Sequence, residues 1–245
     1  MIGDIRTIMS KEFREILQVK GTMKGTSFRI LIFLGIIGVF TPYQMGKEWV
    51  QSPFVLFYSL WFPFMLVSTV IADVFAGEKE RHTLETLLAS RLSDTAILLG
   101  KVISASLYAW GMVLGMLLVG LVTVNATHGH GKLLLYPAPV GLGSVALSLL
   151  VSLLAASLGV LVSLRASTVR QAQQTLSIGA ILIIIVPMLG IQMLPNELKS
   201  RLLHSISHVD VMSAVLIAVA AVVVLDILLL AFTMSRFKRA RLILD

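Results

Sequence analysis

Few residues in this sequence have a type and spacing that could do chemistry. The clearest is Asp226, which lies within a run of Val, Leu and Ile. A carboxylate inside an apolar segment that can cross a bilayer is costly, so it usually faces a partner or a cavity. We therefore treat Asp226 as a candidate for handling a cation or a proton. The alternative interpretation is a protonated or hydrogen-bonded carboxyl that only packs between helices.

Two histidines, His204 and His208, are four residues apart, which on a helix places both imidazoles on one face at metal-ligand spacing. A zinc or copper site is one interpretation. We favour interfacial histidines without a metal. The sequence has no HExxH motif and no cysteine, and no Ser, His and Asp are placed for hydrolysis inside a membrane. We therefore do not expect an enzyme.

The composition indicates a membrane protein with little soluble mass. Of the 245 residues, 57% are hydrophobic and 13% are charged, whereas soluble domains carry about 25% charged residues. No Walker A motif is present, so any ATP must be bound by another chain. The net charge is +7, but the basic residues flank apolar runs instead of forming one face. They therefore indicate membrane topology and no nucleic-acid partner. No cleavable signal peptide is evident at the N-terminus.

We predict an all-α polytopic protein with a single transmembrane domain over residues 28–245. Its apolar runs predict six transmembrane helices, at about 28–44, 54–72, 102–125, 140–164, 172–194 and 211–234. Residues 41–53 are expected to form a short outer loop, and Pro63 is expected to kink the second span. In the fourth span Ser144, Ser148 and Ser152 share one face. We favour a packing seam there over a polar strip beside a transport pathway.

Two further segments are amphipathic but too polar or too short to span. Residues 2–19 place Ile5, Ile8 and Ile16 on one side and Lys11, Glu12 and Arg14 on the other, which predicts a helix along the membrane surface. With the link that follows, it forms a segment over residues 1–27. After Pro195 an apolar stripe predicts an interfacial or re-entrant helix; its members are Leu198, Leu202, Leu203 and Ile206.

The distribution of positive charge sets the expected orientation. With six spans, all 20 lysines and arginines fall on one side except Lys47, Lys132, Lys199 and Arg201. Because positive residues favour the cytoplasmic side, both termini are expected in the cytoplasm. The inner loop with Arg165 and Arg170 is then a second candidate contact for a cytoplasmic partner, besides the charged stretch between the second and third spans.

That charged stretch, GEKERHTLETLLASRLSDTAILLGK over residues 77–101, is the most informative part of the chain. On a helix Leu84, Leu87 and Leu88 gather on one side, which predicts an amphipathic helix at about 78–91. Ser93 and Asp94 supply capping chemistry for the next span. The alternative is a solvated loop helix held by pairs such as Arg81 with Glu85.

The string from Glu78 to Leu88, followed by Gly100 and Lys101, resembles the first cytoplasmic loop of ABC-2 type transporter permeases. In that family the loop carries a coupling helix that sits in a groove of the ATP-binding subunit. The resemblance implies coupling roles for Glu78, Glu80, Arg81, Thr83, Leu84, Glu85, Leu87, Leu88 and Arg91. It also implies that residues 2–19 form the family's elbow helix, for which a plain membrane anchor is the alternative, and that the stripe from Leu198 to Ile206 closes the outer gate.

By this resemblance the chain is the permease subunit of an ATP-driven exporter in the inner (plasma) membrane. Two copies, a homodimer meeting through the first and fifth spans, would work with two P-loop ATP-binding subunits. ATP and Mg would be bound by those partners, and this chain would hold no cofactor. The second class to keep is an ATP-independent ion carrier, or a membrane scaffold, centred on Asp226. The substrate is left open.

Overall fold

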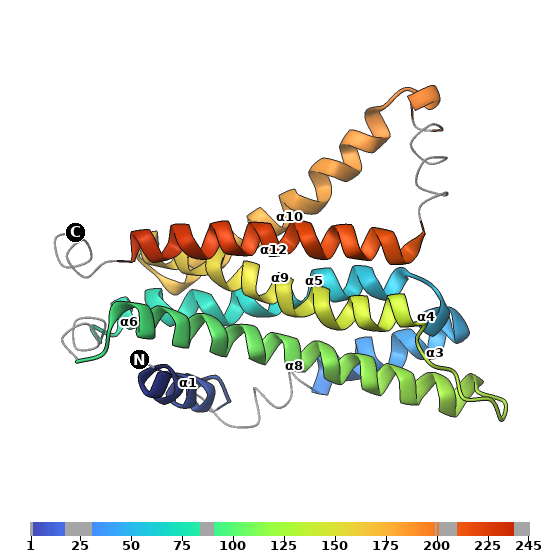
Figure 1. Cartoon of the computed structure of the whole chain (residues 1–245), viewed down its shortest axis with the longest axis horizontal. Helices are drawn as coiled ribbons and strands as arrows, with labels where there is room; N and C mark the ends of the chain where they lie inside the picture. The colour runs from blue at the N-terminus through green and yellow to red at the C-terminus, as the bar shows by residue number, and fades with distance from the viewer. Residues whose placement is uncertain (1, 18–30, 84–90, 199, 201–209, 238–245) are drawn as a thin grey trace.

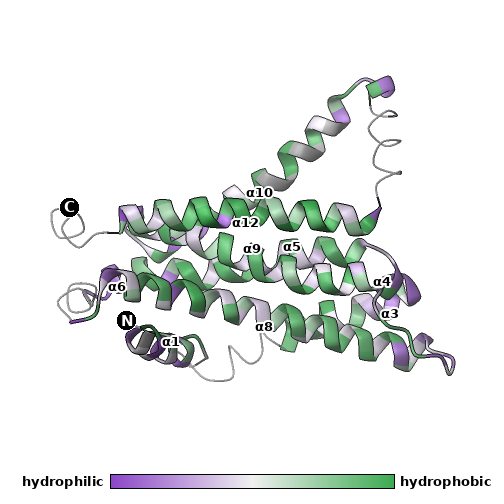
Figure 2. Ribbon diagram, viewed as in Figure 1, coloured by the Kyte–Doolittle hydropathy of each residue, from purple (hydrophilic) through white to green (hydrophobic). Residues whose placement is uncertain are grey.

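The computed structural model describes residues 2–17, 31–83, 91–198, 200 and 210–237. Within them the secondary structure is helical, with no strand. Four long helices run side by side (Figure 1): α5 (Phe54–Ala72), α8 (Asp94–His128), α9 (Ala138–Arg165) and α12 (Val211–Arg236). Figure 2 shows that they are hydrophobic over most of their length. We call the end that carries α1 (Ile2–Leu17) the charged end, and the end with α3 and α4 the far end.

Four helices are long and apolar enough to cross a membrane. They extend over Phe54–Glu80, Asp94–His128, Ala138–Arg165 and Val211–Arg236, and each has 26 residues or more. At about 1.5 Å per residue, every one exceeds a hydrocarbon core of roughly 30 Å. The prediction of an all-α membrane protein is confirmed, and the spans predicted at 54–72, 102–125, 140–164 and 211–234 all lie within these helices.

The other two predicted spans are helical in their described parts. An apolar helix covers Leu31–Met45 and includes a π-helical stretch, η1 (Leu34–Phe40), and α3 (Thr41–Met45). Helix α10 (Val169–Met193) has 25 residues. It packs on α5 and α9, and in Figure 1 its second half leans away from the parallel helices. Within the described part of the chain, large apolar side chains of this second half are exposed, among them Ile185 at 43% and Val186 at 60%.

The prediction of a loop at residues 41–53 is wrong, because these residues form two short helices, with Pro42, Trp49 and Val50 buried. Gly46, with φ at +57°, turns α3 into α4 (Lys47–Gln51). Trp49 is fully buried, and its Nε1 donates to Tyr136 Oη at 3.1 Å. Tyr136 Oη in turn donates to Leu117 O at 3.0 Å. Burial raises the pKa of Tyr136 to about 12, so the phenol keeps its proton and the hydrogen bond that depends on it.

The α5–α9 contact depends on small residues that allow close approach. A Cβ on Gly159 would lie only 2.0 Å from Ile71 Cγ2, so only glycine fits there. On the serine face of α9, Ser148 and Ser152 are fully buried inside the chain, and Ser106 Oγ of α8 donates to Ser152 O at 3.2 Å. This burial is what the packing interpretation expects of the serine face. Helix α5 continues through Pro63.

Candidate functional site

The site begins where α5 ends, with a π-helical turn, η2 (Asp73–Gly77), and the short helix α6 (Glu78–Glu80). Ser163 of α9 supports this turn: its Oγ accepts from Ala76 N at 2.9 Å and donates to Ala72 O at 3.1 Å. Such turns shift the helical register and are frequent at functional sites. The next four residues, 78–81, are all charged. We call them the charged junction.

The first junction residue, Glu78, is buried in an ion cluster. Its Oε1 accepts from Lys101 Nζ at 2.8 Å, and the same ammonium donates to Glu12 Oε1 at 3.0 Å and to Val74 O at 3.1 Å. The Lys101 side chain is 1% exposed, and those of Glu12 and Glu78 are 6% and 7% exposed. One ammonium therefore joins α1, η2, α6 and α8 at the charged end. A buried charge arranged in this way is stable only while its partners stay in place.

The contact between α1 and α8 is also close sterically. A Cβ on Gly100 would lie 2.6 Å from Ile8 Cγ2 and 2.8 Å from Ile8 Cβ. Ile8 is 4% exposed and Ile16 is 8% exposed. Residues 2–17 are thus an amphipathic helix as predicted, but the expected place of Glu12 on its solvent-facing side is wrong. Glu12 is buried because Lys101 draws it toward α8.

The second and third junction residues contact the ends of two other helices. Lys79 Nζ donates to Leu164 O, in the last turn of α9. Glu80 Oε1 accepts from Val169 N at 3.0 Å, at the first residue of α10. A cation near a helix C-terminus and a carboxylate at a helix N-terminus both stabilise the helix, because each is opposite in sign to the partial charge of the helix dipole at that end. Both contacts join residues more than 80 positions apart.

The fourth junction residue ends the helix. Arg81 pairs with Asp73 at 3.2 Å. His82 has φ at +55°, with hydrogen bonds from His82 N to Lys79 O and from Thr83 N to Glu78 O. This is the Schellman pattern of a helix C-terminus, with histidine in the position that usually holds glycine.

The prediction of one helix over 78–91 is therefore wrong, because the helix that contains Glu78 ends at Glu80 and Arg91 lies in a bend. Leu84, Glu85, Leu87 and Leu88 lie outside the described residues. The capping prediction at the far side of this stretch is confirmed. Ser93 is the N-cap of α8, and its Oγ accepts from Ala96 N at 3.3 Å.

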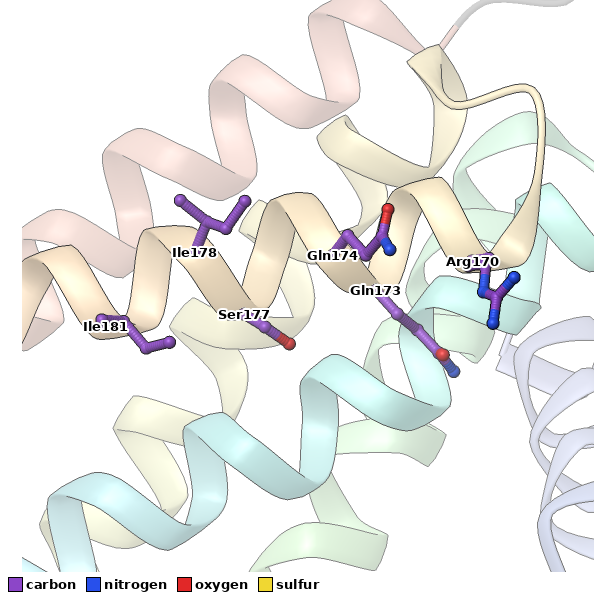
Figure 3. A pocket seen from close by; sticks show the side chains of 6 residues that line it. All are labelled: Arg170, Gln173, Gln174, Ser177, Ile178 and Ile181. Carbon is purple, nitrogen blue, oxygen red and sulfur yellow. The ribbon is translucent and has the colours of Figure 1, made fainter.

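Next to the junction, a groove of about 620 Å³ runs along one face of α10 (Figure 3). Its lining residues are polar in the first turns of the helix and apolar further along: Arg170, Gln173, Gln174, Ser177, Ile178 and Ile181. Gln173 Nε2 donates to Thr69 O of α5 at 3.5 Å. A smaller cavity of about 220 Å³ lies at the α9–α10 connection and includes Arg165 and Gln171. The predicted inner loop with Arg165 and Arg170 is thus adjacent to the charged junction.

Asp226 lies on α12, apart from the junction. It is 3% exposed, and neither Oδ atom has a hydrogen-bond partner within the described part of the chain. In the same part, no three His, Cys, Asp or Glu side chains are grouped to hold a metal ion. Leu198 is described and 46% exposed. His204, His208, Leu202, Leu203 and Ile206 lie outside the described residues, so the predicted outer gate and histidine pair are not placed.

Sequence reasoning missed two members of the ion cluster, Glu12 and Lys101. Lys101 entered only as part of a motif, and Glu12 as one of several surface charges. One signal was available: Lys101 directly follows Gly100 at the start of a long apolar run, where an unpaired ammonium is costly. Its partner could not be named, because Glu12 is 89 positions away.

The charged junction thus joins the ends of several helices. No curated protein matches the chain at a significant level. The family model described as ABC-2 type transporter matches residues 3–224, which includes the charged junction, Lys101 and five of the predicted spans in full. This family comprises membrane components of ABC transport systems, which are generally non-catalytic and work with ATP-binding subunits. The chain therefore belongs to the ABC-2 type transporter family and is a multi-pass permease component of an ABC transport system.

Proposed function

We propose that this chain forms half of the translocation pathway of an ATP-driven exporter. Two copies, as a homodimer, would assemble with two P-loop ATP-binding subunits, which bind the ATP and Mg. This complex would lie in the inner membrane. The charged end of each permease copy would face the cytoplasm. The charge distribution supports this orientation, because the charged end holds Lys79, Arg81, Arg165 and Arg236.

The observation that carries the proposal is the set of contacts made by the charged junction. Residues 78–81 contact α8, α9, α10 and η2 through Lys101, Leu164, Val169 and Asp73. Lys101 in turn donates to Glu12 of α1. The string from Glu78 to Leu88 resembles the family's coupling loop, and the stretch that follows the junction ends at Ser93, the N-cap of α8. An ATP-binding subunit that pushes on this stretch would therefore displace several helix ends together.

The resemblance assigns a coupling role to each of nine residues between Glu78 and Arg91. Under this proposal these residues have two different roles. Glu78 is 6% exposed and Glu80 contacts α10, so both transmit movement from within the chain. Arg81, Thr83, Leu84, Glu85, Leu87, Leu88 and Arg91 remain the proposed contacts with the ATP-binding subunit. Arg81 is about one-third exposed, so it is accessible to a partner while it holds Asp73.

The finer fold belongs to the same proposal. Six spans would be completed by the helix from Leu31 to Met45 and by α10, with α1 as the elbow and the stripe from Leu198 onward as an outer re-entrant element. Large apolar side chains on α10 are exposed, with Ile178 at 58% and Val186 at 60%. This is the surface expected where α10 meets lipid or the second permease copy. Ser148 and Ser152 are fully buried, which argues against a direct pathway role.

One observation favours a second candidate, an ATP-independent ion carrier or scaffold centred on Asp226. Both carboxyl oxygens of Asp226 are buried without a hydrogen-bond partner in the described part of the chain. A group of that kind is costly unless it is neutral or has a ligand. His204 and His208 lie outside the described residues, so the predicted histidine pair adds no support to this candidate.

Affinity purification of the tagged chain from its native membrane in mild detergent distinguishes the two candidates. A stoichiometric P-loop ATPase in the eluate, lost on Leu84→Asp with Leu88→Asp but kept on Leu133→Asp with Leu135→Asp, is the expected result. The control replaces two leucines that are 76% and 61% exposed and lie between α8 and α9, outside the apolar helices. A chain that elutes alone and moves an ion in proteoliposomes without ATP would overturn the permease proposal.

A further inference from the structure

We propose that Lys101 is the positioning residue that makes α1 move with the charged junction, so that α1 takes part in coupling and is not a passive membrane anchor. The inference rests on the function proposed above, because it needs an ATP-binding subunit to displace the junction. It assigns a role to α1 and to Lys101 that neither the resemblance nor the amphipathic pattern decides.

The Lys101 ammonium uses all of its donor protons. It carries three protons, and three acceptors lie within hydrogen-bond distance: Glu78 Oε1 at 2.8 Å, Glu12 Oε1 at 3.0 Å and Val74 O at 3.1 Å. The acceptors come from α6, α1 and η2. Movement of the junction relative to α1 must therefore break at least one bond to this ammonium.

The ion cluster of Lys101, Glu12 and Glu78 is buried. All three side chains are 7% exposed or less, so water cannot replace a lost partner. Separating a buried charge from its partner costs more than moving a surface helix along with it. A second ammonium, Lys11 Nζ, is 3.8 Å from Glu78 Oε1 but is half-exposed. Its contribution is weaker because solvent screens it.

Helices α1 and α8 are also in close steric contact beside the ion cluster. Gly100 directly precedes Lys101, and a Cβ there would lie 2.6 Å from Ile8 Cγ2 and 3.5 Å from Ile5 O. Helix α1 thus lies with its backbone close to α8, on the residue next to the ion cluster. Since interfaces packed this closely transmit small displacements, a push on α8 reaches α1 directly. The ion cluster prevents the two helices from separating when the direction of movement reverses.

Neighbouring charged residues of α1 differ in their exposure. Arg14 and Glu15 are exposed, as expected for the polar face of a helix on a membrane surface. Glu12 is 4% exposed. A surface anchor needs no buried carboxylate, and burying one is unfavourable unless it is paired. The pairing with Lys101 is therefore a specific connection between α1 and the junction.

Hydrogen–deuterium exchange on the purified complex in lipid nanodiscs tests the inference without knowledge of the substrate. Exchange is compared with no nucleotide and with ATP plus orthovanadate, in peptides that cover α1 and peptides that cover residues 78–83. In the unaltered complex, ATP is expected to change exchange in both sets. If exchange at the junction does not respond to ATP, the proposed function is contradicted. If the junction responds while α1 does not, only the present inference is contradicted.

The variant Lys101→Met keeps most of the apolar stem and removes the ammonium. Its junction peptides are expected to respond to ATP while the response of α1 is lost. The matched control, Lys11→Met, removes the half-exposed ammonium next to the cluster and should keep both responses. If Lys101→Met does not assemble, Glu12→Gln supplies the comparison, because it keeps the shape and weakens only the α1 contact.

The outcome for Lys101→Met decides the inference. A Lys101→Met complex in which α1 responds to ATP as in the unaltered protein would overturn the proposal.

Discussion

Glu78 and Lys101 form an ion pair of 2.8 Å between Oε1 and Nζ, and both side chains are nearly inaccessible to solvent. Glu78 comes from a segment that resembles a docking surface for another protein. The structure instead directs it into the chain, toward the start of α8. The charged junction is thus a connector between helices, and the docking surface is expected to begin after it.

The ion cluster predicts an unequal effect of single and combined substitutions. Lys101→Met alone leaves two buried carboxylates without their main partner, and we expect a loss of about 3–5 kcal/mol in stability. The triple variant Glu12→Gln, Glu78→Gln and Lys101→Met should lose less, because no buried charge remains. Thermal unfolding in detergent, followed by intrinsic fluorescence, measures both. Equal losses in the two variants would contradict the importance of the unpaired carboxylates.

The close contact at Gly100 predicts a local steric effect. Gly100→Ala should destabilise the protein by about 1–3 kcal/mol, because its Cβ would overlap Ile8. Gly111→Ala on the same helix has no atom within 4 Å of the new Cβ, so it should be neutral or slightly stabilising. Adding Ile8→Ala to Gly100→Ala should recover part of the loss. The stability order of these three variants tests whether α1 lies on Gly100 in solution.

The contact between Glu80 and Val169 predicts a change at the start of α10. Glu80→Ala removes an acceptor from a helix N-terminus, at a cost of about 1 kcal/mol. Amide exchange at Val169 and in the next turn should increase, while exchange in α9 stays the same. Glu48→Ala, at the far end, serves as the control for the loss of one carboxylate. No change at Val169 would mean that α10 starts without help from the junction.

Asp226 predicts an unusual outcome for a buried charged residue. Because neither oxygen has a hydrogen-bond partner in the described part of the chain, Asp226→Leu should keep or raise stability, and Asp226→Asn should be close to neutral. Under the permease proposal both variants keep ATP-dependent responses of the junction. A loss above about 2 kcal/mol, the usual penalty for an orphaned partner, would instead reveal an interaction with a second copy or a ligand.

The sequence alone determined the membrane character, the family and the positions of the long helices. An apolar run of sufficient length must form a helix in lipid, since only a helix satisfies its backbone hydrogen bonds within the segment. The N-cap at Ser93 was also predictable, because its hydrogen bond joins residues only three positions apart. Local chemistry of this kind is readable without a fold.

Only the tertiary structure decided where the polar groups of the site go. Glu12 looks like any other charge on an amphipathic helix until Lys101 is brought next to it, and Trp49 looks like part of a loop until Tyr136 supplies a partner 87 positions away. Glu80 likewise looks like a solvated charge until the backbone N–H of Val169, 89 positions away, is brought to 3.0 Å from its Oε1. Pairing energies depend on distance in space, and the packing of separate helices sets that distance.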